Sequence, residues 1–132
     1  MSHLLDTSIC VFLIRNRGSS VRQRFEAFDI GDLVISAITE AELRFGADKS
    51  ADPSKNHRQL DRLLVTLPVV EFGSCAAMHH GQIRSELERV GTPIGPLDQL
   101  IAAHARSLDL TLVTNNTGEF SRVRNLKIED WS

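Results

Sequence analysis

The chain has 132 residues, a size that suits one domain with one ordinary hydrophobic core. Apolar residues make up 42% and charged residues 24%, which excludes disordered, collagen-like and coiled-coil proteins. The apolar runs are too short for a transmembrane span, and the N-terminus lacks the pattern of a signal peptide. A net charge of −2 argues against a protein that coats nucleic acid with its whole surface.

Short apolar strands alternate with longer helical segments along the chain. We predict strands at residues 4–5, 33–36, 69–72, 110–114 and 126–128. Helices are predicted at residues 7–16, 21–28, 39–49, 56–67, 76–90 and 96–108. Thr7 or Ser8 is expected to cap the first helix and Thr39 the third, and Gly91 to end the fifth. This alternation favours one α/β domain over residues 1–132, with a mostly parallel sheet of about five short strands flanked by helices.

The basic residues and the cysteines each leave more than one interpretation open. Arginine supplies 12 of the 15 basic residues, which suits phosphate binding but also follows from GC-rich coding. One stretch without any acid contains Arg15, Arg17, Arg22 and Arg24. These arginines could bind RNA phosphates, form a solvated face or contact a protein partner. The two cysteines, Cys10 and Cys75, lack zinc-site spacing, and we expect both to be buried thiols in a reducing compartment.

Two acidic residues follow predicted strands. Asp6 comes directly after the strand at 4–5, and Glu119 lies a few residues beyond the strand that ends at Thr114. Ligand sites in open α/β sheets form beyond the carboxyl ends of the strands, so both side chains are candidates for a site. Taken alone, Asp6 is equally well explained as a helix N-cap, and Glu119 as an exposed loop acid.

Two further acids share a face with apolar residues of their helices. Glu42 is spaced to point with Ile38, Ala41 and Phe45. Asp98 is spaced to point with Leu97, Leu100, Ile101, Ala105 and Leu108. A buried carboxylate is costly unless it is neutralised, paired with an arginine, held near a helix N-terminus or bound to a cation.

The topology predicts that these four acids converge at one edge of the sheet. Four carboxylates repel one another and raise each other's pKa, and a divalent cation relieves that conflict. A ligand set made only of oxygen atoms suits Mg²⁺ or Mn²⁺ better than zinc. Such a site is typical of enzymes that hydrolyse phosphodiester bonds.

Four motifs, in order along the chain, carry a family resemblance. They are Leu4–Ile9, Ser36–Leu43, Ile94–Ala105 and Leu112–Phe120, and the ending Glu129-Asp130-Trp131 also fits. The chain resembles the PIN-domain ribonucleases, and among them the VapC-type toxins of type II toxin–antitoxin systems. In this resemblance Asp6, Glu42 and Asp98 match the acidic metal ligands, and Glu119 matches a variable fourth acid.

The resemblance implies a metal-dependent endoribonuclease that acts as a toxin in the bacterial cytoplasm, without a membrane. The substrate would be tRNA or another structured RNA, hydrolysed with the help of a carboxylate-bound Mg²⁺ or Mn²⁺ ion and an activated water. The implied partners are a second copy of the chain and a VapB-type antitoxin, whose C-terminal arm lies in the site and presents a basic residue to the acids.

The chain departs from the family pattern at two positions. Ser8 stands where the family usually has Asn, and Asn116 stands where many members have Asp. Together with Thr114, these residues are expected to support the acids rather than add charge. The departures leave open a non-catalytic PIN-like module that binds protein or RNA. A phosphatase that uses Asp6 as a nucleophile is a weaker alternative, because it needs a second acid where Ser8 stands.

Several other side chains have structural interpretations. His80 and His104 lie in apolar helical stripes and are expected to be hydrogen-bonded core histidines rather than catalytic bases. The stripe of Leu60, Leu63, Leu64 and Leu67 is expected to be core.

Overall fold

The computed structural model describes residues 1–16 and 19–131, and its centre is a sheet of five parallel strands. Their order across the sheet is β3-β2-β1-β4-β5. The strands are β1 (His3–Leu5), β2 (Leu33–Ser36), β3 (Val69–Val70), β4 (Thr111–Val113) and β5 (Ile128–Glu129). The predicted α/β fold with a parallel sheet is therefore confirmed.

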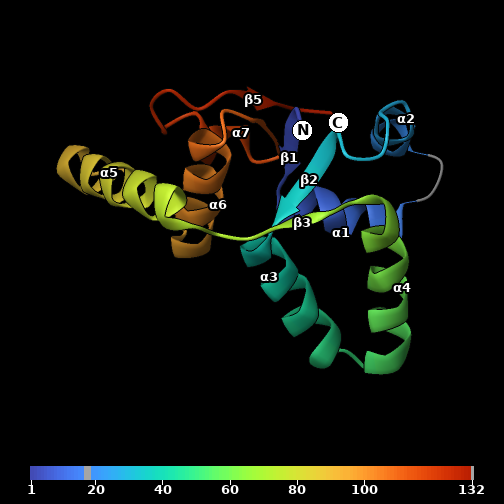
Figure 1. The fold of residues 1–132 in the computed structure, drawn as a ribbon. Coiled ribbons are helices and arrows are strands. Elements are labelled where there is room, and N and C mark those ends of the chain that lie inside the picture. Colours follow the sequence, from blue (N-terminus) through green and yellow to red (C-terminus); the bar gives the residue numbers. More distant parts are fainter. Residues whose placement is uncertain (17–18, 132) are drawn as a thin grey trace.

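Seven helices surround this sheet in the described residues. They are α1 (Thr7–Arg15), α2 (Ser20–Glu26), α3 (Ala37–Asp48), α4 (Pro53–Thr66), α5 (Ser74–Val90), α6 (Pro96–Ser107) and α7 (Thr117–Phe120). Figure 1 shows α5 and α6 at one side and α1 and α4 at the other, with α3 projecting from the end of the sheet between them. None of these helices is long and apolar enough to cross a membrane.

The sheet separates the buried residues into two clusters, where a single core was expected. Successive side chains of a strand point to opposite faces, so Leu4 and Leu5 pack into different clusters. Leu4 packs with Ile83 and Ile101 of α5 and α6. Leu5 packs in the cluster of α1 and α4, which contains the predicted leucine stripe: Leu60, Leu63 and Leu67 are buried and Leu64 packs against them.

Helix starts differ most from prediction, because several polar residues near each start could serve as the cap. Asp6 caps α1 in place of Thr7 or Ser8, and Ser36 caps α3 in place of Thr39. Helix α4 begins at Pro53, not at residue 56, because Asp52 accepts a hydrogen bond from the Lys55 backbone and proline suits the first helical position. Short α7 was not predicted, whereas Gly91 ends α5 in a left-handed conformation as expected.

Some expected faces and burial states are wrong. Helix α3 buries Thr39, Leu43 and Ala47, whereas Ala41 and Phe45 are exposed. Leu97 of α6 is also exposed. Cys10 is buried as predicted, but Cys75 lies on an exposed turn of α5.

The central position of β1 gathers several elements at one edge of the sheet. Strand β1 pairs with β2 on one side and with β4 on the other, all in parallel. The Asp6 backbone N–H, just past β1, donates to the Val113 carbonyl of β4 at 3.0 Å. Helices α1 and α3 start directly at the carboxyl ends of β1 and β2, so their first turns lie together.

Candidate active site

Asp6 is buried at the end of β1, with 3% of its surface exposed. Its Oδ1 accepts hydrogen bonds from the Ile9 backbone at 2.9 Å and from the Ser8 hydroxyl at 2.7 Å. Its Oδ2 accepts a hydrogen bond from the Thr114 hydroxyl of the neighbouring strand segment at 2.5 Å. Burial raises the pKa of Asp6, and these donors partly oppose that rise. Asp6 is thus a helix N-cap whose second oxygen is held by another element.

Glu42, in the second turn of α3, is tied to α1. The Thr7 hydroxyl, one residue after Asp6, lies 2.7 Å from Glu42 Oε1 and donates to it, and it lies 3.2 Å from the buried Thr39 hydroxyl. Thr7 and Thr39 were each predicted only as helix caps. Their actual role is to hold a glutamate beside the start of α1, a contact that local sequence cannot specify because the partners are far apart in the chain.

Asp98, in the first turn of α6, is an acid whose pKa is strongly raised by its surroundings. Burial is the largest cause that raises its pKa to about 6, followed by repulsion from Glu119, Glu42 and Asp6 and by a hydrogen bond with Glu119. The structure therefore brings the four predicted acids within one another's electrostatic reach. In the described part of the chain, no lysine, arginine or histidine forms an ion pair with any of them.

The supporting residues link these acids to the loop after β4. The Thr114 hydroxyl accepts a hydrogen bond from the Asn116 backbone at 2.9 Å while it donates to Asp6. The Asn116 side-chain amide donates to Glu119 Oε2, at the start of α7. Ser8, Thr114 and Asn116 thus contact the acids directly. A supporting role for them in catalysis stays a prediction.

Gly95, the residue before α6, was not singled out in the sequence. A Cβ atom at this position would lie 3.3 Å from Asp98 Oδ2, closer than most such contacts. The missing side chain therefore leaves room for the Asp98 carboxylate. In the sequence, Gly95-Pro96 is typical of a helix start and does not reveal this contact with Asp98.

The donor set fits a hard divalent cation, because it consists of carboxylate oxygens with no cationic side chain beside them. In the conformation described for residues 1–16 and 19–131, no three acidic, histidine or cysteine side chains stand close enough to enclose an ion. A hard cation held here by fewer than three of these side chains would complete its coordination with water, as Mg²⁺ commonly does.

The arginines proposed as RNA ligands lie in different surroundings. Arg22 donates to the Leu13 carbonyl at 2.5 Å and pairs with Glu26. Arg24 pairs with Glu129 at 2.9 Å and lies over the Trp131 ring. Arg15 is exposed at the end of α1, and Arg17 lies outside the described residues. RNA binding by these side chains stays a prediction, and for Arg22 and Arg24 it competes with contacts within the chain.

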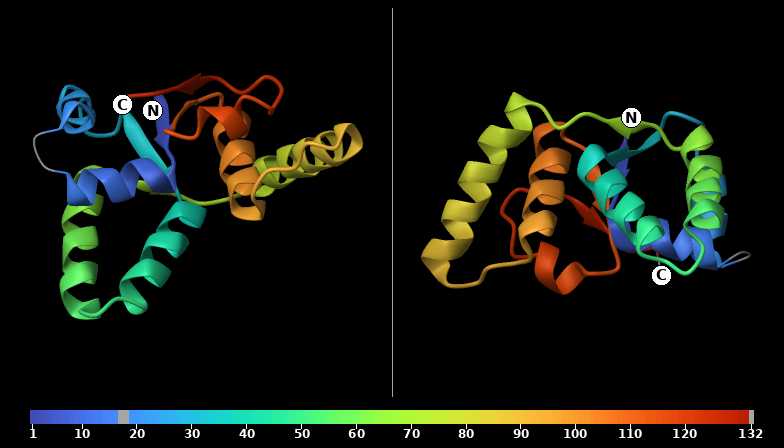
Figure 2. Two further views of the ribbon diagram at one scale, coloured as in Figure 1. Left: turned by 180° about the vertical axis from the view of Figure 1, so that it is seen from behind. Right: turned by 90° about the horizontal axis from the view of Figure 1, so that it is seen from below.

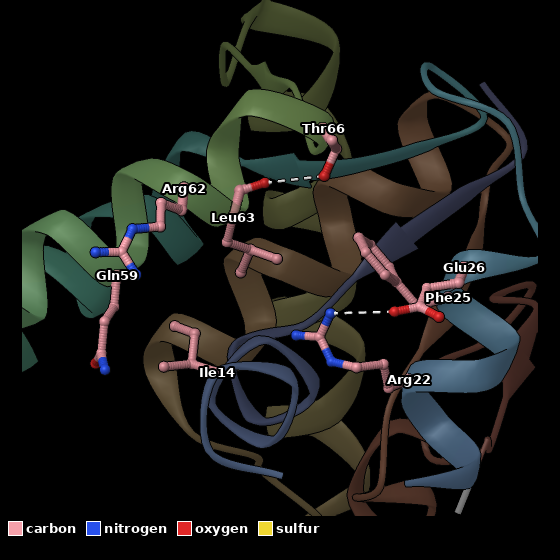
Figure 3. Close-up of a pocket in the computed structure, with 8 residues that line it drawn as sticks. All are labelled: Ile14, Arg22, Phe25, Glu26, Gln59, Arg62, Leu63 and Thr66. Carbon is pink, nitrogen blue, oxygen red and sulfur yellow. Dashed lines mark hydrogen bonds and ion pairs between the residues drawn. The ribbon is translucent and has the colours of Figure 1, made fainter. Parts of the chain in front are cut away.

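A cavity of about 450 Å³ lies between α1, α2 and α4 and contains none of the four acids (Figure 3). Its lining includes Ile14, Arg22, Phe25, Glu26, Arg62 and Leu63. The Arg22 guanidinium points into this space between the helices, and its buried Nε has no hydrogen-bond partner among the described residues.

Comparison with known proteins connects the chain to a family. The PIN domain family model matches residues 3–126. The chain is 48% identical to the tRNA(fMet)-specific endonuclease VapC of Shigella flexneri, across all of this chain and 99% of that protein. It is 39% identical to ribonuclease VapC2 of Rickettsia felis, across 99% of this chain and 98% of that one.

Solved structures agree with these sequence relatives. A DNA-bound VapBC from Salmonella typhimurium matches with a TM-score of 0.95 and 44% identity, over 100% of this chain and 99% of that one. VapBC2 from Rickettsia felis, bound to a DNA fragment from its promoter, matches with a TM-score of 0.95 and 38% identity over the full length of both chains. The chain belongs to the PIN-domain family and, within it, to the VapC ribonucleases.

Proposed function

We propose that this endoribonuclease is a toxin that hydrolyses a phosphodiester bond of tRNA, with Asp6, Glu42, Asp98 and Glu119 as its acidic centre. The observation that carries the proposal is the group of acids around Asp98, where burial first, and then repulsion from Glu119, Glu42 and Asp6, raises the pKa of the Asp98 carboxyl group to about 6. The choice of tRNA follows the names of two relatives, which are tRNA(fMet)-specific endonucleases.

We infer that the acids hold Mg²⁺ or Mn²⁺, and the carboxylate chemistry supports this class of ion without distinguishing the two metals. When bound, such an ion lowers the pKa of water and offsets negative charge on phosphate oxygens. The residues of the chain prepare the ligands. Ser8 and Thr114 hold the Asp6 carboxylate in one orientation, Thr7 holds Glu42, and Asn116 holds Glu119.

This arrangement supports catalysis over the alternative of a non-catalytic binding module. The two departures from the family pattern were the reason to consider that alternative. Ser8 nevertheless donates to Asp6, and Asn116 donates to Glu119, so neither departure leaves its acid without support. An electrostatically unfavourable group of acids has no evident benefit in a module that binds no cation.

The partner that we propose is a VapB-type antitoxin, because the matched structures are VapBC complexes. A basic residue on an antitoxin arm would relieve the same repulsion that a cation relieves, and would thereby block the site. Assembly into a homodimer stays a prediction. Since tRNA is the proposed substrate and the relatives are bacterial, we propose the bacterial cytoplasm as the place of action.

Cleavage of tRNA(fMet) in the presence of Mn²⁺ or Mg²⁺ tests the proposal. Wild type should cut it, and Asp98→Asn should lose at least about a hundredfold in rate, as expected when a metal ligand is removed. Asp109→Asn is the matched control, because Asp109 is an exposed aspartate that pairs with Lys127 at the surface, and it should cut like wild type. Equal activity of Asp98→Asn and wild type would refute the assignment of Asp98. If wild type cuts an elongator tRNA as fast as it cuts tRNA(fMet), specificity for tRNA(fMet) is refuted.

A further inference from the structure

His104 is a buried histidine of α6 with polar contacts in two other elements. Only 1% of its surface is exposed. Its Nδ1 lies 2.7 Å from the hydroxyl oxygen of Ser36, which is completely buried where β2 ends and α3 begins. The imidazole also forms a hydrogen bond with the backbone of Glu71, just after β3, and the Phe72 ring packs edge-on against it with centroids 5.3 Å apart.

The direction of the Ser36–His104 hydrogen bond follows from the other partners of the two side chains. The Ser36 oxygen accepts a hydrogen bond from the Ile38 backbone at 3.0 Å, as the N-cap of α3. A hydroxyl oxygen has two lone pairs and could also accept from His104, so the bonds of Ser36 alone do not fix the direction. The hydrogen bond with the Glu71 backbone supplies the direction: a carbonyl only accepts, so we infer that the neutral imidazole carries its proton on the other ring nitrogen and that Nδ1 accepts from Ser36. Burial lowers the pKa of His104, in agreement with this neutral form.

This pair joins the two helices that carry Asp98 and Glu42. Asp98 lies in the first turn of α6, and Glu42 lies in the second turn of α3. A helix behaves as a rigid element over so short a distance, so a contact at His104 sets how α6 sits against the start of α3. In the right-hand view of Figure 2, α3 and α6 lie beside one another, in agreement with the His104–Ser36 contact.

We propose that His104 is a positioning residue of this enzyme: through Ser36 it holds α6 against α3 so that Asp98 and Glu42 can ligate the same cation. The proposal rests on the acidic centre of the proposed function. His104 acts through Ser36 and not by contact with the acids. A histidine that only filled the core would affect stability alone, whereas loss of His104 should change metal affinity as well.

Replacement of His104 separates the two roles. His104→Leu keeps a large apolar side chain but cannot accept the Ser36 proton. We expect its Kd for Mn²⁺, measured by calorimetry without RNA, to rise about tenfold, in the range seen when supporting contacts of metal ligands are lost. The kcat for RNA should fall by a similar factor, whereas KM should change by less than about twofold, because the substrate surface is untouched.

His104→Asn is the conservative variant, because its Oδ1 can accept from Ser36 where Nδ1 does. It should recover the Mn²⁺ affinity to within about threefold of wild type. Ser36→Ala deletes the same hydrogen bond and leaves the imidazole in place, so it provides a test even if His104→Leu does not fold. The double variant Ser36→Ala/His104→Leu should bind Mn²⁺ as tightly as whichever single variant binds it less tightly, because both substitutions remove the same contact.

Leu87→Ala is the matched control, because Leu87 is buried in the same cluster as residues of α6 and its apolar side chain cannot take part in the hydrogen bonds of this pair. It should lower the Tm and leave Mn²⁺ affinity and kcat unchanged. Wild-type affinity in both Ser36→Ala and His104→Leu would overturn the positioning role while leaving the acidic centre intact. A similar loss of affinity in Leu87→Ala would also overturn it, because any core defect would then suffice. A wild type that binds no Mn²⁺ would overturn the acidic centre and the positioning role together.

Discussion

Two groups of carboxylates in this molecule have opposite surroundings. Glu129, at the end of β5, accepts hydrogen bonds from Trp131 at 2.8 Å, from Arg24 at 2.9 Å and from His3 at 3.3 Å. The Trp131 indole is the largest cause that lowers the pKa of Glu129, and His3 and Arg24 add to it. Asp98 is instead partly buried among other acids, and its burial first, then their repulsion, raises its pKa to about 6.

Glu129 therefore stabilises the fold, whereas the acids around Asp98 lack a positively charged partner within the described residues. Glu129 has its charge balanced within the chain and joins the C-terminal segment to α2 and β1. The acidic centre has hydrogen-bond donors that hold its members in place but no counter-charge among the described side chains. Proteins tolerate such a conflict where function needs it.

The largest expected effect comes from Asp6. Asn is as good an N-cap as Asp, so Asp6→Asn should fold with nearly the wild-type Tm. It removes a charge from the acidic centre, and RNA cleavage should fall by at least about a hundredfold. A cleavage assay beside a thermal melt separates the two effects. Full activity in a folded Asp6→Asn protein would mean that Asp6 serves only as a helix cap.

A smaller effect is expected at Gly95. The added methyl group of Gly95→Ala would lie 3.3 Å from Asp98 Oδ2 and displace that carboxylate by a few tenths of an ångström. Because catalysis is sensitive to such displacements, we expect RNA cleavage to fall about tenfold with little change in Tm. Gly118→Ala has open space around the new methyl group and is the matched control. Equal rates in the two variants would show that the position of Asp98 is not so tightly constrained.

Glu129→Gln should show the reverse pattern. It loses the ion pairs with Arg24 and His3, which are partly exposed, so the free energy of unfolding should fall by about 1 kcal/mol. Cleavage activity should be unchanged. Urea unfolding and an RNA assay test this pair of outcomes, and a loss of activity at constant stability would remove the distinction between the two groups of acids.

The pH dependence of stability should have opposite signs at the two places. The pKa of Glu129 is lowered in the folded state, so its contribution is present above its unfolded pKa and is lost as pH falls through the folded value. The pKa of Asp98 is raised, so the metal-free fold gains stability as pH falls from above 6 towards 4 and loses it as pH rises through 6. The stability of wild type minus that of Asp98→Asn, followed from pH 4 to 8 in chelator, isolates this contribution. A flat difference would contradict the repulsion inferred at Asp98.

The sequence predicted the sheet class and the four acids because strand order in α/β proteins follows strong topological rules. An acid that follows a buried strand is visible in the sequence, as Asp6 is. The exact helix starts were not visible, because Ser36 and Thr39 are equally good caps in isolation. The prediction of which face of α3 is buried was wrong for a related reason. Thr39 is buried because its hydroxyl has a partner in Thr7, whereas the apolar side chain of Phe45 is exposed.

Contacts between distant residues could not be predicted. Thr7 with Glu42, Ser36 with His104 and Arg24 with Glu129 each join parts of the chain that only the tertiary fold brings together. The expected burial of Cys75 was wrong, because the first turn of α5 buries Ala76 and leaves Cys75 exposed. The prediction that His104 is a hydrogen-bonded core residue is confirmed, although its partner was unknown.

The stability of metal-free Asp98→Asn at pH 7 tests the central claim most directly. If burial and the neighbouring acids destabilise the Asp98 carboxylate until a cation binds, the free energy of unfolding of Asp98→Asn in chelator should exceed that of wild type by about 1 kcal/mol, a value that allows for partial exposure. Mn²⁺ should then stabilise wild type and leave Asp98→Asn almost unchanged. An Asp98→Asn protein that is less stable than wild type in chelator, and gains as much from Mn²⁺, would contradict the account.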